Sequence, residues 1–309
     1  MNTDAIAPTV DFQPAANSAR TILMPDTSQI FSDRARRFLH LADHHSLADW
    51  LLYLGHLTQC QHELASSLND LPLPDAGALD QARRHNMPPL NAASSVRPAI
   101  WHTVLQRLID KLIAVSPSVT LARLYALRDA APQRLDALAT ALLNGQPDPT
   151  DLADVPLVAA ALQTVWTAWA ARVDPATLAL LDSPGLCPCC GSLPVASIVR
   201  SSADTTQVNN LRYLHCSLCN TEWNVPRAVC TACATDRGIS YREIDGSSGA
   251  VRAECCDTCH SYLKLVVQEK DPGVDPVADD LATLALDLLV DEAGYSRSGP
   301  NLLLLGGAG

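Results

Sequence analysis

Four pairs of cysteines, each with two residues between its members, lie between residues 187 and 259 of this 309-residue chain. Two intervening residues allow a tight turn that points both sulfurs at one ion while backbone amides hydrogen-bond to the thiolates. One such pair is weak evidence, but four pairs in one segment predict metal binding. The predicted ligands are Cys187, Cys190, Cys216, Cys219, Cys230, Cys233, Cys256 and Cys259.

The gaps between the pairs indicate how they combine. There are 25 residues between Cys190 and Cys216 and 22 between Cys233 and Cys256, but only 10 between Cys219 and Cys230. Pairing in chain order therefore gives two modules of similar length, each with four cysteines around one ion. A crossed arrangement, first pair with third and second with fourth, stays open.

Other roles for these thiols fit less well. Without a secretory signal the chain is expected in a reducing compartment, where disulfide frameworks are rare. A thioredoxin-like site needs a CxxC pair that opens a helix, whereas Gly191 and Pro194 follow the first pair. Both features favour metal binding over disulfides or thiol exchange.

Five residues near the pairs, or of the same type, have less specific roles. Cys189 and Cys255 adjoin predicted ligands and are either spectators or reserve ligands, and Cys60 follows a helical apolar pattern typical of a core thiol. His215 and His260 adjoin cysteines, but four thiolates already complete a tetrahedron. We expect the two histidines to support the sites or lie at the surface.

The spacing does not select the metal. Zinc and iron both accept four thiolates in a tetrahedron. Zinc would make each module a structural recognition surface, whereas a single iron would cycle between two oxidation states.

The elements that position the cysteines change in character near residue 182. Before it, Leu and Ala dominate and apolar residues recur at helical spacing, with a loop rich in Pro, Asn and Ser at 71–98. Two antiparallel helices are expected within 28–68. Further helical segments are expected at 100–115, 119–130, 132–143 and 152–181.

The predicted fold class is α+β. An all-helical domain (1–182) is followed by two small zinc-ribbon-like CxxC modules (183–226 and 227–268) and by a C-terminal helix and tail (269–309). The segment 263–268 is expected to be a strand and 274–292 an amphipathic helix, while 294–309 looks poorly anchored.

Charge and hydropathy exclude several partners. The net charge is −11, and a four-thiolate site carrying a divalent or trivalent ion stays negative, so broad attraction to phosphate or anionic lipid is not expected. The most apolar window, 155–171, is too short and too interrupted to span a bilayer. With no basic segment followed by an apolar run at its start, the chain is expected to be cytoplasmic and to have protein partners.

The sequence from about 181 to 300 closely resembles the FdhE family of formate dehydrogenase accessory proteins. The resemblance lies in the segments CPCCGSLPVAS, RYLHCSLCNTEW, AECCDTCHSYLK and QEKDPGVDPVADDLATLALD, and all four cysteine pairs of the family are present. The doubled cysteines leave the ligand open by one residue at 189/190 and 255/256, where CxxC spacing favours Cys190 and Cys256. The helical half supplies no comparably specific motif.

The resemblance implies rubredoxin-type modules joined to a helical domain and iron at both four-cysteine sites, with zinc as the alternative. It also implies a cytoplasmic, chaperone-like assembly factor, not an enzyme. Its partner would be the molybdenum- or tungsten-containing catalytic subunit of formate dehydrogenase, before that subunit is exported or docked at the membrane.

Two functions from other classes fit the sequence less well. A zinc-ribbon nucleic-acid-binding protein needs a basic stripe, but residues 200–264 hold six Arg and one Lys against four Asp and three Glu. A thiol-dependent or electron-transfer enzyme would use Cys189 or Cys255, for which His215 or His260 is the available base. We therefore expect neither nucleic-acid binding nor catalysis.

Overall fold

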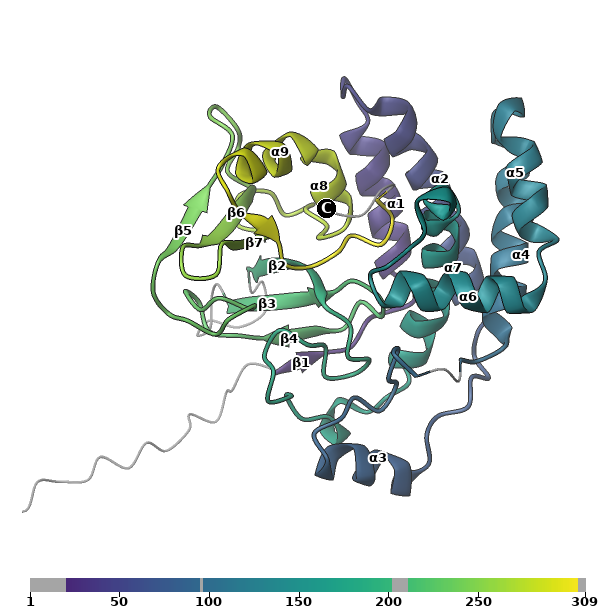
Figure 1. Cartoon of the computed structure of the whole chain (residues 1–309), viewed down its shortest axis with the longest axis horizontal. Helices are drawn as coiled ribbons and strands as arrows, with labels where there is room; N and C mark the ends of the chain where they lie inside the picture. Colours follow the sequence, from purple (N-terminus) through teal and green to yellow (C-terminus); the bar gives the residue numbers. More distant parts are fainter. Residues whose placement is uncertain (1–20, 95–96, 202–210, 305–309) are drawn as a thin grey trace, which may run out of the picture.

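The computed structural model describes residues 21–94, 97–201 and 211–304, and it combines a bundle of helices with one mixed sheet (Figure 1). The predicted mixture of helix and sheet is therefore confirmed. Residues 1–20, on which the expectation of no secretory signal mainly rests, lie outside the described residues.

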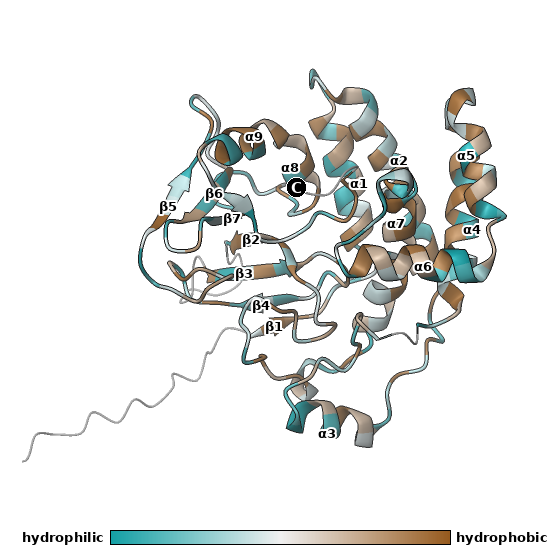
Figure 2. Ribbon diagram, in the orientation of Figure 1, coloured by the Kyte–Doolittle hydropathy of each residue, from teal (hydrophilic) through white to brown (hydrophobic). Residues whose placement is uncertain are grey.

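The N-terminal half contains the helices that the apolar spacing predicted. They are α1 (Ile30–Leu41), α2 (Ala48–Ala65), α4 (Ile100–Ile113), α5 (Ser118–Arg128), α6 (Pro132–Leu143) and α7 (Val155–Ala170), with short 3-10 turns at Pro149–Asp151 and Pro175–Thr177. Almost every side chain of α7 is buried and most are apolar, the pattern of a helix enclosed on all sides. It packs against α2, α4 and α6. Figure 2 colours the ribbons of these helices by the hydropathy of each residue.

This half differs from the expected architecture in two places. The proline-rich segment 71–98 contains a helix, α3 (Ala76–Arg84), which Asp75 caps by accepting a hydrogen bond from the Ala78 amide at 2.8 Å. A short strand, β1 (Ile22–Leu23), pairs with β4 (Glu222–Asn224) in the sheet. Two residues are too few to show the alternating pattern by which a strand is recognised, so β1 could not be predicted.

The eight strands found in the described residues all belong to one sheet. The other strands are β2 (Pro194–Arg200), β3 (Leu211–Cys216), β5 (Ile239–Arg242), β6 (Val251–Cys256), β7 (Ser261–Val267) and β8 (Ser296–Arg297). Their order is β1-β4-β3-β2-β7-β6-β5, with β8 beside β7. β2 and β7 pair in parallel, with Ser197 opposite Leu265, so the two cysteine segments share one continuous sheet instead of forming two separate ones.

The chain follows the same path twice within this sheet. A cysteine pair precedes β2 and β3, and the next pair begins at Cys216, the last residue of β3, before the chain returns as β4. The second half repeats this order with β5, β6 and β7, and its second pair begins at Cys256, the last residue of β6. In both halves the last two strands pair antiparallel, so each cysteine unit has the same local frame.

The C-terminal segment differs from the expected single helix and loose tail. The helix is split at Thr283 into α8 (Ala278–Ala282) and α9 (Leu284–Glu292). The expectation that 294–309 is poorly anchored is wrong for its described part, because β8 pairs with β7 and Leu303 is fully buried. Gly299 lies so close to β2 that a Cβ atom there would overlap the carbonyl oxygen of Pro194.

None of the described helices is both long and apolar enough to cross a membrane.

Candidate metal centres

Each cysteine pair forms a turn with the same backbone geometry. The amide four residues after the first cysteine donates to that cysteine's carbonyl in three of the turns: Gly191 to Cys187 (2.8 Å), Ala234 to Cys230 (2.9 Å) and His260 to Cys256 (2.9 Å). The residue after the second cysteine has a positive φ in all four turns: Gly191 (78°), Asn220 (57°), Ala234 (59°) and His260 (53°). Gly and Asn adopt this conformation most readily, so Gly191 and Asn220 were a sequence signal that the spacing argument did not use.

The turns bring the eight predicted ligands together in two groups of four. In each group all four sulfurs lie within 4.8 Å of one another. We call Cys187, Cys190, Cys216 and Cys219 the first cluster, and Cys230, Cys233, Cys256 and Cys259 the second cluster. The grouping follows chain order, and the crossed alternative is not the one formed.

The spacing of the sulfurs fits a metal ion and not a disulfide. The paired Sγ atoms are 3.6 Å (Cys187–Cys219) and 3.4 Å (Cys190–Cys216) apart in the first cluster. They are 3.7 Å (Cys230–Cys259) and 3.8 Å (Cys233–Cys256) apart in the second. A tetrahedral ion with metal–sulfur bonds of about 2.3 Å corresponds to sulfurs about 3.8 Å apart, whereas a disulfide needs about 2.05 Å. Both clusters could therefore hold a metal ion.

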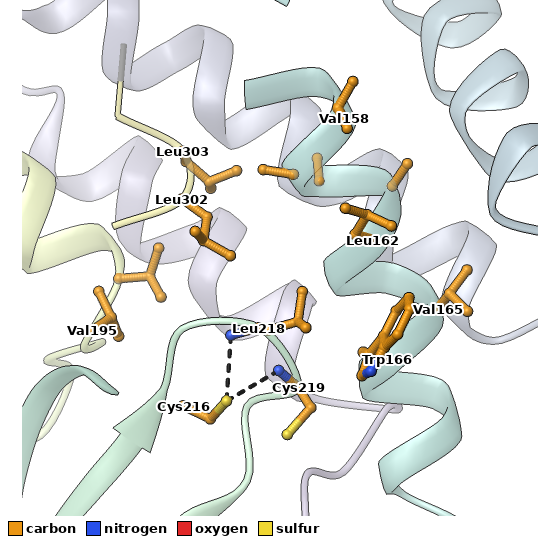
Figure 3. Close-up of a cluster of buried hydrophobic side chains, with 14 of the residues drawn as sticks. Val158, Leu162, Val165, Trp166, Val195, Cys216, Leu218, Cys219, Leu302 and Leu303 are labelled. Atoms are coloured by element: carbon orange, nitrogen blue, oxygen red, sulfur yellow. Dashed lines mark hydrogen bonds between the residues drawn. The ribbon is translucent and has the colours of Figure 1, made fainter. Parts of the chain in front are cut away.

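The first cluster lies in the main hydrophobic core, where none of its four sulfur-bearing side chains is exposed. The amides of Leu218 and Cys219 both donate to Cys216 Sγ at 3.4 Å, as Figure 3 shows. Trp166 of α7 lies beside this turn in the same view. Amide donation favours thiolate over thiol, which is the form that binds metal.

Two polar side chains of α7 attach the helical domain to this turn. Gln163 Nε2 donates to the Ser217 carbonyl at 2.7 Å, and Asn220 Nδ2 donates to Thr167 Oγ1, also at 2.7 Å. All these groups are buried. Gln163 and Thr167 are also two of the polar residues that interrupt the apolar window at 155–171; Gln163 bonds to the backbone of this turn and Thr167 to the side chain of Asn220.

The proline-rich segment packs against the first turn of the same cluster. The amides of Leu90 and Ala92 donate to the carbonyls of Cys189 and Cys190, each at 2.9 Å. Trp166 Nε1 in turn donates to the Leu90 carbonyl at 3.0 Å. This segment therefore covers the cluster from within the chain itself.

A buried polar network adjoins the first cluster. His215 lies between the Glu222 carboxylate (2.8 Å from Nδ1) and Asn220 Oδ1 (2.9 Å from Nε2). Burial alone would raise the pKa of Glu222, but Arg200 and His215 outweigh it and lower that pKa to about 2. Arg34 of α1 donates to Asn220 Oδ1 at 2.8 Å, which connects the network to the helical domain. His215 thus supports the site and is not one of the four clustered ligands.

The second cluster is open to solvent. Cys230 and Cys256 are buried, but Cys233 and Cys259 are exposed. The Ser261 hydroxyl lies 3.0 Å from Cys259 Sγ, and the Thr221 hydroxyl lies 3.2 Å from Cys219 Sγ in the equivalent place of the first cluster. His260 provides the positive-φ residue of its turn, and its ring lies against Tyr295 with centroids 6.0 Å apart.

Burial raises the pKa of the Cys187 and Cys216 thiols well above the usual value. Burial also opposes ionisation of Cys219, but hydrogen bonds from the surrounding thiols, Cys187 first, prevail and lower its pKa. Cys219 therefore ionises more readily than Cys187 or Cys216, and a bound positive ion would favour the thiolate form of all four ligands.

The three remaining cysteines lie outside both clusters. Cys189 and Cys255 are fully buried beside ligands, and Cys60 packs against the helical core and is partly exposed. A hydrogen bond with Cys219, together with burial, raises the pKa of Cys189 well above its usual value. Burial raises the pKa of Cys255. All eleven cysteines are free thiols in this structure.

The fold and the clusters define a class of protein in which a helical domain is built around one of two tandem four-cysteine units. Models of the FdhE N-terminal, central and C-terminal domains match residues 19–182, 186–227 and 228–304. The chain belongs to the FdhE family.

Individual relatives support this assignment along almost the whole chain. The Protein FdhE homolog of Stutzerimonas stutzeri (strain A1501) is 38% identical over 283 residues, 90% of each chain. That of Pseudomonas aeruginosa is 36% identical and covers 96% of this chain and 97% of its own. The crystal structure of the FdhE protein from Pseudomonas aeruginosa superposes with a TM-score of 0.84 at 36% identity, covering 93% of this chain and 100% of that one.

Proposed function

We propose that this protein is an assembly factor for formate dehydrogenase that binds iron at both four-cysteine clusters. It would act in the cytoplasm on the catalytic subunit, before that subunit is exported or joins its complex. The observation that carries the proposal is the pair of clusters with tetrahedral sulfur spacing in a chain of the FdhE family. The predicted ligands are the eight clustered cysteines.

Several features support a binding role over a catalytic one. Cys189 and Cys255 are buried and their pKa values are raised, so neither thiol is poised as a nucleophile. The net charge of −11 favours a protein client over nucleic acid. Bound iron would supply a one-electron couple, while the chain's own residues set its access and its hydrogen bonding.

The proposal is tested in cells that lack their own copy of this protein. We expect the wild-type chain to restore formate dehydrogenase activity, and Cys190→Ser and Cys219→Ser variants to restore far less, with the catalytic subunit made in equal amounts. Immunoblots measure that amount, and co-purification of the tagged subunit measures binding. Full activity with variants shown to be metal-free would contradict the proposal.

The metal is tested separately on protein purified without oxygen. About two irons per chain with thiolate-to-iron charge-transfer bands are expected from two single-iron four-thiolate sites. About two zincs and no colour would leave two structural modules and remove the one-electron role.

A further inference from the structure

We propose that the two clusters differ in kinetic class: the second is an exchangeable metal site, and the first retains its metal while the helical domain stays packed. The inference rests on metal binding under the proposed function and adds which of the two clusters takes up and releases metal. Metal would enter and leave through the face bounded by Cys233 and Cys259, the exposed ligands of the second cluster. The class of group that takes this metal is a thiolate or imidazole, because these are the donors that compete with cysteine for zinc or iron.

Access of an incoming ligand is the first argument. A metal held by four thiolates is transferred when another donor reaches it and replaces one of them. In the second cluster one cysteine of each turn is exposed, and the neighbours Asp257, Thr258 and His260 are exposed as well. In the first cluster no ligand side chain is exposed, so a donor has no path to the ion.

The covering of the first cluster is the second argument. Gln163 and Trp166 of α7 bond to the Ser217 and Leu90 carbonyls, and the 87–94 segment bonds to the carbonyls of Cys189 and Cys190. Opening this cluster therefore breaks contacts that belong to the main core. Release of its metal should then occur at the rate of global or near-global unfolding.

The position of the second cluster in the sheet is the third argument. Along the chain, its first turn connects β4 to β5. In the sheet, β5 is an edge strand that pairs with β6 alone among the described strands. The core residues near it form a small hydrophobic core that is separate from the main one. They include Cys255, Tyr262, Leu286, Val290 and Tyr295. A local opening here leaves the helical domain intact.

Release kinetics of the wild-type protein give the direct test. The protein is loaded with two equivalents of zinc and mixed with excess 4-(2-pyridylazo)resorcinol in native buffer. We expect one equivalent to leave at least 100-fold faster than the other, and the slow one to leave rapidly only in denaturant. Release of both equivalents at one rate would overturn the inference while leaving metal binding intact, whereas a chain that takes up no metal would also overturn the proposed function.

Thiol labelling locates the fast site. Iodoacetamide added during the fast phase should modify the four cysteines of the second cluster, Cys233 and Cys259 first, and spare those of the first cluster, as read by peptide mass spectrometry. The Cys233→Ser variant should bind one zinc tightly, and that zinc should show the slow phase alone. Early labelling of Cys187 or Cys216 in the folded protein would refute the assignment.

Discussion

The two four-cysteine clusters have the same backbone and different surroundings. Each comprises two CxxC turns, of which the second begins at the end of a strand. In each, a hydroxyl group lies two residues after the last cysteine. The first cluster is enclosed by α7 and by the chain around Leu90 and Ala92, whereas the second has two exposed ligands. The local sequence therefore determines how four sulfurs converge, while the elements packed around them determine whether the site is part of the core.

The largest difference between the two clusters is expected when one ligand is removed at equivalent positions. Cys216 and Cys256 each begin the second turn of their cluster, and both are buried. In metal-loaded protein we expect Cys216→Ser to lower the free energy of unfolding by more than about 5 kcal/mol, because metal binding at this site contributes directly to folding. A loss of that size is enough to unfold a typical domain. Cys256→Ser should lose at most about 3 kcal/mol.

Urea unfolding followed by tryptophan fluorescence measures both variants, because Trp166 and Trp223 are buried in the core that contains the first cluster. Equal losses of stability in the two variants would show that burial does not distinguish the clusters.

Arg34 of α1 bonds to Asn220 beside the first cluster and forms a buried charge pair with Asp275. Arg34 is fully buried, donates to Asp275 at 3.0 Å and to Asn220 at 2.8 Å, and its loss leaves the Asp275 carboxylate without its cation. Arg34→Met should therefore cost about 3–5 kcal/mol of unfolding free energy. The control Arg36→Met, on the same helix but with its side chain 77% exposed, should change stability by at most about 0.5 kcal/mol.

A cost for Arg34→Met no larger than that of its control would mean that this connection does not stabilise the fold. The same variants should be passed through the zinc-release assay. We expect Arg34→Met to speed the slow phase and leave the fast phase unchanged.

A smaller effect is expected from the α7 side chain that bonds to the cluster's backbone. Gln163→Leu removes the donor to the buried Ser217 carbonyl, and an unsatisfied buried carbonyl costs about 1–3 kcal/mol. The neighbouring Thr164→Val is the matched control, because the Thr164 hydroxyl bonds only within its own helix, to the Ala160 carbonyl. Denaturant titration of both variants should separate them, and indistinguishable midpoints would refute the role given to Gln163.

These residues also show what the sequence could and could not predict. The grouping of the cysteines was predictable because turn geometry and gap lengths are local properties, and α7 was predictable from its apolar run. The Arg34 pair was not, because its partners Asn220 and Asp275 lie far along the chain, and nothing local distinguishes Arg34 from Arg36 and Arg37 on the same helix. Gln163 and Thr167 did give a signal, since polar residues in an otherwise apolar helix imply buried hydrogen bonds.

The different exposure of the two clusters could not be predicted either. The two cysteine modules are alike in spacing, and nothing within residues 227–268 indicates that two ligands of the second cluster stay exposed. That property depends on where α7 and the 71–98 segment pack, which is a matter of tertiary structure. The continuous sheet has the same origin, since the β2–β7 pairing joins strands from different modules.

The smallest effect should come from the hydroxyl groups beside the last cysteine of each cluster. Ser261→Ala removes the hydroxyl 3.0 Å from Cys259 Sγ, and Thr221→Val removes the one 3.2 Å from Cys219 Sγ. A partner of this kind is worth about tenfold in metal affinity, or about 1.4 kcal/mol. Because water reaches the second cluster and replaces the lost hydrogen bond, Ser261→Ala should weaken zinc binding there less than Thr221→Val weakens it in the first cluster. Competition titrations with a chelator measure both affinities, and a larger loss for Ser261→Ala would contradict the view that solvent access is what separates the two sites.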